Sequence, residues 1–266
     1  MSLVQAIVLA IIEGITEFLP ISSTAHMKFA NPLLGVQPSP FSDLFEIVIQ
    51  LAAILSVVVL YYKRFFDFSK LNFYFKLVVA LIPAIVAGVL LKKYIEARLG
   101  NLMFIAIVMV AGGVVLLFID RMFKKPSIHS QDEVSYKNSF AIGCYQVLSI
   151  VFPGLSRSAA TIIGGLAQKL DRRTAAEFSF FLAVPTMLAA SVKSLWDVHK
   201  SNPEVFSRDY MTTLAVGCAV AFVVSMLAIR FFITYLQRHG FRIFGYYRIF
   251  AGALILFLIW RGVIHP

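Results

Sequence analysis

Charged residues are scarce in this sequence. Of its 266 residues 14% are charged and 59% are hydrophobic, and the mean hydropathy is +0.83. Soluble domains carry about 25% charged residues, so the composition excludes an ordinary soluble protein. No hydrophilic stretch is long enough to form a soluble domain with a basic face, which argues against nucleic-acid binding. The sequence is that of an integral membrane protein.

Cysteine and acidic residues are also scarce, with two Cys and 14 Asp or Glu in the whole sequence. Cys144 and Cys218 lie in apolar segments far apart in the sequence, so we interpret them as packing residues and predict no disulfide. The N-terminal stretch has no basic segment and carries Glu13 and Glu17, so we expect it to belong to the fold. The net charge of +10 suits anionic lipids or an anionic substrate, although a cytoplasmic excess of Lys and Arg explains most of it.

Long apolar runs are abundant. Six of them approach the roughly 20 residues that a membrane-spanning helix needs. They cover 44–61, 77–91, 102–119, 178–194, 211–229 and 244–260. We therefore predict an all-α polytopic membrane protein with six transmembrane helices, in which 1–266 form a single membrane domain.

The chain contains two copies of one unit. Three pairs of segments match in the same order, which predicts a duplication. The pairs are "MVAGGVVLLFIDR" (109–121) with "IFAGALILFLIWR" (249–261), "FEIVIQLAAIL" (45–55) with "AEFSFFLAVPTM" (176–187), and "EFLPISSTAH" with "SIVFPGLSRSA", the last with Pro20 on Pro153 and Ser23 on Ser156.

The matches define the organisation of the domain. Repeat one covers 1–125, a polar linker covers 126–137, and repeat two covers 138–266. Each copy holds three spans, an odd number, so the second copy enters the membrane from the opposite side. This plan is an inverted-topology repeat, in which sites form near the midplane at the repeat interface.

Each copy opens with a segment that proline interrupts. Before its first glutamate, region 1–30 offers about ten apolar or neutral residues, too few to cross a membrane. Pro20 then breaks the helix and Ser22 can cap a new one. Region 138–168 repeats this pattern with Ser156 as the cap. Because broken backbone at membrane depth must be buried or line a wet cavity, we predict two re-entrant helix pairs whose breaks share one interior site.

The distribution of basic residues predicts the orientation. One set of loops carries about fourteen Lys and Arg residues against about eight elsewhere, so we predict that these loops are cytoplasmic. The loops are 62–76, 121–137, 166–175 and 230–243. Both termini, and the opening of the site, are then expected on the extracytoplasmic side.

The first break carries acids, a hydroxyl and an imidazole. Glu13 and Glu17 are four residues apart, on one helix face, and carboxylates in a membrane are functional by default. They could supply a base, hold a divalent cation together with a substrate phosphate, or form a structural pair. Ser23 and His26 are three residues apart on one face. Alone, they would more often be a helix cap and a structural histidine.

The second break supplies a cation. In our alignment Gln146 and Ile150 replace the two glutamates, and Arg157 replaces Thr24. The planar fork of an arginine suits phosphate, and the free N-termini of the broken helices favour anions. The alternative is a permanent ion pair of Arg157 with one of the glutamates. Ser156, Ser158 and Thr161 add hydroxyl groups nearby.

Two motifs carry a resemblance to a known family. "EGITEFLPISSTAH" (13–26) and "PGLSRSAAT" (153–161) resemble the signatures E-x-x-x-E followed by P-x-S-S-T-G-H, and P-G-x-S-R-S-x-x-T, of the undecaprenyl-diphosphatase family of the bacitracin-resistance type. The similarity extends over most of the chain. Ala25 and Ala159 stand where the family often has Gly. The lipid-phosphatase signature S-R-x5-H-x3-D does not fit, because Ile163 occupies its histidine position.

The resemblance implies an enzyme. It would hydrolyse undecaprenyl diphosphate to undecaprenyl phosphate and inorganic phosphate, recycle the lipid carrier of cell-wall synthesis and give bacitracin resistance, in the bacterial cytoplasmic membrane. It implies stimulation by a divalent cation (Mg or Ca), which we assign to Glu13 and Glu17, and no organic cofactor. Matching positions give the catalytic set Glu13, Glu17, Ser23, His26 and Arg157.

Several points stay open at this stage. We expect the diphosphate to lie between the two breaks, in contact with Ser22, Thr24, Ser156, Arg157, Ser158 and Thr161. The nucleophile could be Ser23, His26 or water. The sequence does not determine whether the protein forms a homodimer. The rival class is an inverted-repeat transporter or polyprenyl-phosphate flippase, since broken helices and membrane carboxylates also serve transport.

Overall fold

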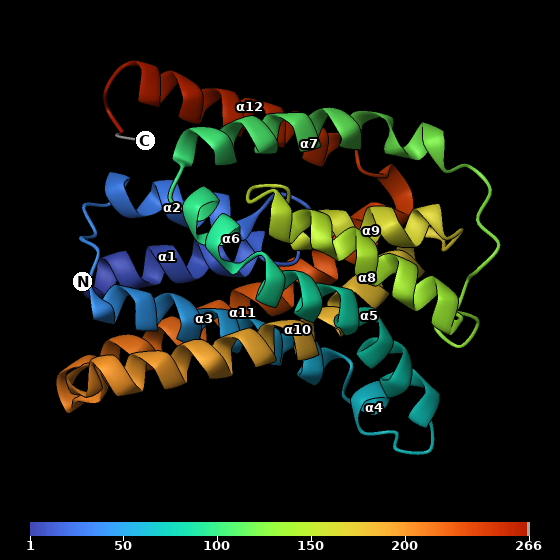
Figure 1. Cartoon of the computed structure of the whole chain (residues 1–266), viewed down its shortest axis with the longest axis horizontal. Coiled ribbons are helices and arrows are strands. Elements are labelled where there is room, and N and C mark those ends of the chain that lie inside the picture. Colours follow the sequence, from blue (N-terminus) through green and yellow to red (C-terminus); the bar gives the residue numbers. More distant parts are fainter. Residues whose placement is uncertain (265–266) are drawn as a thin grey trace.

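The chain folds into a bundle of α-helices (Figure 1). The computed structural model describes residues 1–264, apart from the side chains of Glu96, Arg208 and Asp209. Over these residues there is one 3-10 helix and no β-strand, which confirms the all-α prediction. The elements are α1 (Leu3–Thr16), α2 (Ser23–Leu33), α3 (Pro40–Leu60), α4 (Tyr62–Phe65), α5 (Leu71–Leu90), α6 (Lys92–Leu99), α7 (Leu102–Met122), α8 (Tyr136–Val151), α9 (Arg157–Ala167), α10 (Arg172–Ser201), η1 (Pro203–Phe206), α11 (Arg208–His239) and α12 (Arg242–Trp260).

Within residues 1–264, six helices are long and apolar enough to cross a membrane. They are α3, α5, α7, α10, the part Tyr210–His239 of α11, and α12. The predicted number and positions of the spans are therefore confirmed. Two of the helices, α3 and α10, begin before the predicted apolar runs at a polar capping residue. In α10, for example, Asp171 accepts a hydrogen bond from the backbone N–H of Thr174 (2.7 Å), so the helix begins six residues before the predicted span.

Each broken segment consists of two helices joined by a short break. Residues 17–22 separate α1 from α2, and 152–156 separate α8 from α9. Ser22 and Ser156 cap the second helix of each pair, as predicted, and each has a left-handed backbone, with φ of 73° and 76°. Residues other than glycine rarely adopt this conformation. Re-entry into the membrane from one side stays a prediction.

The caps correct the alignment of the two copies. Ser22, not Ser23, corresponds to Ser156, because the second break has two residues between its proline and its cap and the first break has one. As a result Ser23 corresponds to Arg157, and each is the first residue of its helix.

The helix packing fits the predicted duplication. The opening helix of each copy packs against the middle span of the other copy: α1 against α11, and α8 against α5. The last spans, α7 and α12, pack against one another, as Figure 1 shows at the upper edge of the bundle. The repeat boundaries stay predictions, and the last two residues of repeat two lie outside the described residues.

The four basic loops meet at one end of the molecule. Side chains and backbone link them to one another and to the linker. The contacts are Arg64 with Asp132 (2.5 Å), the backbone N–H of Ser127 with the Lys169 carbonyl (2.9 Å), and the backbone N–H of Phe241 with Asp120 (2.8 Å). The position of the four basic loops at one end of the molecule fits the predicted topology. The assignment of this end to the cytoplasmic side stays a prediction.

Candidate active site

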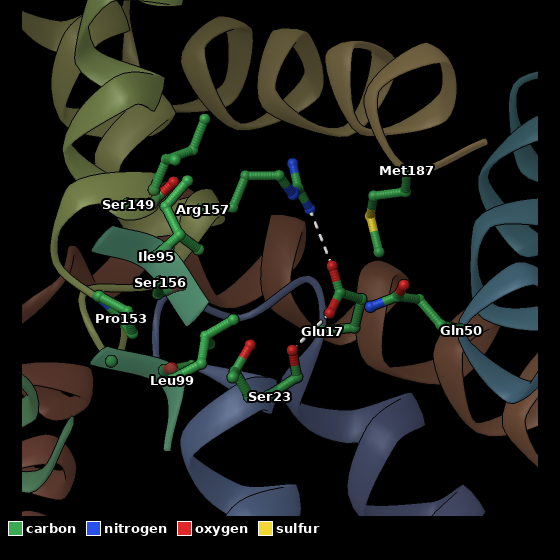
Figure 2. Close-up of a pocket in the computed structure, with 14 residues that line it drawn as sticks. Glu17, Ser23, Gln50, Ile95, Leu99, Ser149, Pro153, Ser156, Arg157 and Met187 are labelled. Atoms are coloured by element: carbon green, nitrogen blue, oxygen red, sulfur yellow. Dashed lines mark hydrogen bonds and ion pairs between the residues drawn. The ribbon is translucent and has the colours of Figure 1, made fainter. Parts of the chain in front are cut away.

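A cavity of about 230 Å³ lies between the two breaks (Figure 2). The N-termini of α2 and α9 both border it, through Ser23 and Arg157. The first N–H groups of a helix have no acceptor within the helix, and the helix dipole favours negative charge there. Two such ends at one cavity make it suited to an anion. Its other polar lining residues are Glu17, Ser22, Thr24, Gln50, Ser149 and Ser156.

Glu17 is the centre of the hydrogen-bond network in this cavity. The Ser23 hydroxyl donates to Glu17 Oε2 (2.5 Å), and Arg157 Nη2 lies 3.3 Å from Oε1. Figure 2 shows both contacts as dashed lines. Serine and carboxylate are therefore close enough for proton transfer. The sequence predicted that these three residues would share a site, and the structure brings them together.

Arg157 is paired but keeps a free donor. Its Nη1 donates to the Ser179 carbonyl (3.0 Å), and Nη2 donates to Glu17. The alternative of an ion pair with a glutamate is thus present in the structure. Yet Arg157 Nε is buried and has no partner among the described residues. Because a buried donor without an acceptor costs about 1–3 kcal/mol, this N–H fits an additional acceptor such as a phosphate oxygen.

Ser158 and Thr161 do not line the cavity. Ser158 donates to the Phe18 carbonyl of the first break (2.7 Å). Thr161 donates to the Arg157 carbonyl (2.9 Å) and lies 2.7 Å from the Ser179 hydroxyl. These hydroxyls are used to tie the breaks and α10 together, so the structure does not bring them to the expected diphosphate position.

His26 also points away from Ser23 and Glu17. Its Nδ1 lies 2.7 Å from the Ser22 carbonyl, which can only accept, so Nδ1 carries the hydrogen. Its Nε2 then accepts from the Tyr247 hydroxyl (2.6 Å), and the two rings stack with centroids 5.5 Å apart. Both ring nitrogens are therefore occupied. In this arrangement His26 supports the strained backbone of Ser22 and is not in contact with the other predicted catalytic residues.

A second cavity of about 250 Å³ adjoins the first. Ser23, Thr24 and Gln50 border both cavities, and Glu13 lines the second one. Glu46 also lines it and accepts a hydrogen bond from Asn31 (2.6 Å). Our sequence reasoning missed Glu46 and Gln50. Two polar residues four apart in an apolar span were the signal that could have identified them.

The donor set fits a divalent cation in part. Glu13 Oε1 is buried and without a partner among the described residues, whereas both oxygens of Glu17 are engaged. Within the described part of the chain, no group of three or more His, Cys, Asp or Glu residues could hold a metal ion. A cage made entirely of protein ligands therefore does not fit. Mg²⁺ is usually held by one or two carboxylates together with substrate phosphates and water, and Glu13 could contribute to such a site.

Arg248 is the residue of greatest structural consequence that the sequence reasoning missed. Its side chain, from α12, is fully buried, and within the described part of the chain no carboxylate pairs with it. It donates to carbonyls of both breaks and of α7. The acceptors are Pro20 (3.1 Å), Gly154 (2.9 Å), Leu155 (2.7 Å) and Met109 (3.2 Å). One guanidinium thereby holds the two breaks in a fixed relation. An arginine inside a predicted span was the available signal.

Fold and site together define a class. This is a polytopic all-α membrane protein with a polar site between two helix breaks, one acidic and one cationic. The sequence profile of the family described as bacitracin resistance protein BacA matches residues 6–254. The chain therefore belongs to this family.

Curated relatives resemble the chain over nearly its whole length. A protein named undecaprenyl-diphosphatase from Flavobacterium johnsoniae is 51% identical, over 100% of this chain and 98% of the relative. Proteins of the same name from Porphyromonas gingivalis and Bdellovibrio bacteriovorus are each 46% identical; the alignments cover 99% and 98% of this chain, and the same shares of those relatives.

Proposed function

We propose that this chain hydrolyses undecaprenyl diphosphate to undecaprenyl phosphate and inorganic phosphate, with the diphosphate bound between the two breaks. The observation that carries the proposal is the Ser23–Glu17–Arg157 arrangement, in which a hydroxyl, a base and a phosphate-binding cation border one cavity. The names of the relatives support the same activity. The reaction would return the lipid carrier to cell-wall synthesis, in keeping with the bacitracin-resistance family.

The size of the cavity suits the head of such a lipid. Pockets that enclose drug-sized ligands measure about 300–1,000 Å³, and this one, at about 230 Å³, is smaller. It can take a diphosphate and not a long isoprenoid. Ile95 and Leu99 of α6, with Met187 of α10, form an apolar border. The first isoprene units would lie against this border and the remaining tail between helices.

Nucleophilic attack by Ser23 is the mechanism that the geometry favours. Glu17 takes the hydroxyl proton, and Ser23 Oγ forms a bond to the terminal phosphorus while the bond from phosphorus to the bridging oxygen breaks. Glu17 passes this proton to the departing oxygen of undecaprenyl phosphate, which restores its carboxylate. Water then attacks the phosphoserine and gives a proton to Glu17, the bond from phosphorus to Ser23 Oγ breaks, and Glu17 returns the proton to Ser23 Oγ as phosphate is released. Direct attack by water is the alternative. His26 is the weakest candidate, because its contacts direct it away from Glu17.

Charge neutralisation falls to Arg157 and the helix N-termini. The unpartnered Nε of Arg157 would donate to a phosphate oxygen, and N–H groups at the starts of α2 and α9 would add further donors. A divalent cation held by Glu13, Glu17 and the substrate would supply additional positive charge when bound. The inner membrane of a bacterium and an extracytoplasmic opening belong to this proposal as predictions.

Phosphate release from undecaprenyl diphosphate by the purified protein in detergent tests the function. Detergent removes any gradient, so a transporter or flippase would release no phosphate. We expect activity in the native protein and its loss in Ser23→Ala and Arg157→Ala. Ser149→Ala is the matched control, because Ser149 lines the same cavity but donates to the Gln146 carbonyl (2.7 Å). Full activity in Arg157→Ala would overturn the proposal, and phosphate trapped on His26 would overturn the assignment of Ser23.

A further inference from the structure

A separate basic cavity lies where α7 runs into the linker. Its volume is about 370 Å³. Four cationic side chains line it, together with apolar residues, and no carboxylate is part of the lining. The cations are Arg121, Lys124, Lys125 and Lys169, and the apolar residues are Met122, Phe123, Pro126, Leu166, Ala167 and Leu170. α7 separates this cavity from α6, which borders the candidate active site. At 1.5 Å per residue its 21 residues span about 30 Å.

The backbone of the linker builds this cavity. The N–H groups of Ser127 and Ile128 donate to the Lys169 carbonyl (2.9 and 3.1 Å), and the N–H of Asp171 donates to the Ile128 carbonyl (2.9 Å). These bonds hold the start of the linker against the end of α9. They keep the basic residues 121–125 opposite Lys169, so the cluster results from specific pairing and not from a loose loop.

The four cations have no partner among the described residues. The neighbouring arginines differ, since Arg172 pairs with Asp120 (2.6 Å) and Arg173 pairs with Glu177 (2.9 Å). Asp120 and Glu177 are thus already neutralised, and Asp171 is engaged by the Thr174 N–H and by His129. The helices α7 and α9 both end here, and each C-terminus carries a partial charge of about −0.5. Together these ends balance roughly one of the four positive charges, which leaves a clear excess.

We infer that this cavity binds the phosphate head group of an anionic phospholipid. Arg121 lies in the last turn of the α7 span, which ends at Met122, and Lys124 and Lys125 directly follow it, at the level of lipid phosphates. Met122 is 63% exposed and Phe118 is 50% exposed, which provides an apolar surface for the lipid chains beside the cations. A soluble phosphate ion has no apolar part that could contact this surface. Basic pockets at the ends of spans recognise anionic head groups in this way.

The inference is independent of the proposed enzyme activity and can be tested without it. The full chain is placed in nanodiscs of phosphatidylcholine, with or without phosphatidylglycerol. Native mass spectrometry then measures which lipid stays bound after delipidation. The test variant combines Lys124→Gln, Lys125→Gln and Lys169→Gln. The matched control combines Lys137→Gln, Arg230→Gln and Arg238→Gln, which removes equal charge from exposed positions of the same set of basic loops, outside the cavity.

We expect the native protein and the control to retain phosphatidylglycerol, and the test variant to bind it about 100-fold more weakly at low ionic strength. Salt should weaken binding to the native protein. Equal retention by all three proteins, or equal loss in the control, would overturn the inference. The inference is also overturned if the test variant loses as much thermal stability in phosphatidylcholine alone as it does with phosphatidylglycerol present. The cations would then act by stabilising the C-termini of α7 and α9. Thermal protection of the native protein by inorganic phosphate, equal to that by the lipid, would identify a soluble anion instead.

Discussion

Substitution of Gly112 by alanine should impair catalysis through Arg248. Gly112 lies in α7 against the guanidinium that holds both breaks. A Cβ atom at this position would overlap Arg248 Nη2 and lie 3.0 Å from its Cζ. Nη2 is the atom that donates to the Gly154 carbonyl, so the added methyl group forces the guanidinium to shift, and we expect its hydrogen bonds to the two breaks to weaken or the breaks to move with it. The substitution leaves the chemistry of the site itself unchanged.

The magnitude follows from packing and from alignment. Overpacking a buried position costs about 1–3 kcal/mol of folding free energy, which a domain with an unfolding free energy of about 5–15 kcal/mol tolerates. Catalysis is more sensitive, because a displacement of about 1 Å between reacting groups can cost about 100-fold in rate. We therefore expect kcat per folded molecule to fall by roughly 10- to 100-fold, since Ser23 and Arg157 directly follow the two separate breaks.

Gly252→Ala is the matched control for this prediction. Gly252 lies in the same contact between α7 and α12, and the three atoms nearest to a Cβ there belong to Val110 and Ala106 and not to Arg248, with Val110 Cγ2 at 2.7 Å and the Ala106 carbonyl oxygen at 3.0 Å. Phosphate release and thermal unfolding are measured for both variants. If both lose the same activity for the same loss of stability, Arg248 acts as ordinary packing and our reasoning is refuted.

Three further outcomes are expected. Ser158→Ala leaves a buried carbonyl of the first break without its donor, so thermal unfolding should show a loss of about 1–3 kcal/mol. Tyr247→Phe removes the donor to His26, and we expect a loss of about 1 kcal/mol with most of kcat retained; a complete loss of activity would mean that His26 reacts directly. A hydrogen bond from Arg64 holds the pKa of Asp132 below its usual value, so its stabilising effect is present at neutral pH and lost as the pH falls through that lowered pKa. Asp132→Asn should therefore lower the melting temperature at pH 7, and this difference should begin to shrink below about pH 4 and vanish only below the lowered pKa.

Apolar length and proline position were enough to predict the frame of the molecule. Six spans, two breaks and their serine caps could be read from the sequence because each depends on local properties of the chain: hydrophobic length, a missing N–H, and a side chain that reaches its own backbone. The helix starts at Ser23 and Arg157 agree with this reading. The number of spans between the basic loops also predicted that these loops lie at the same end of the molecule, because each span takes the chain across to the other side.

The orientations of the polar side chains could not be predicted in this way. His26 and Ser23 are one turn apart, and this spacing suggested a common target. The partner of His26 is Tyr247, more than 200 residues away, and nothing in the local sequence identifies it. Similarly, Ser158 lies next to Arg157 in sequence, but its hydroxyl is bound by a carbonyl of the other break. Which hydroxyl faces a ligand depends on these distant contacts.

The predicted duplication accounts for the way in which a serine and an arginine, the two groups proposed for catalysis, face one another. Ser23 and Arg157 occupy equivalent positions, at the first residue of each helix, so the repeat itself places them on two sides of one cavity. A change in one copy could then introduce a cation without disturbing the serine of the other.

Arg248, in contrast, has no equivalent arginine in the first copy. In the alignment of 109–121 with 249–261 its counterpart is Val108, which is buried and apolar. One guanidinium already binds carbonyls of both breaks, so it lies where the two copies meet. A second arginine from the other copy would need the same space and the same acceptors, and for this reason one copy alone can supply it.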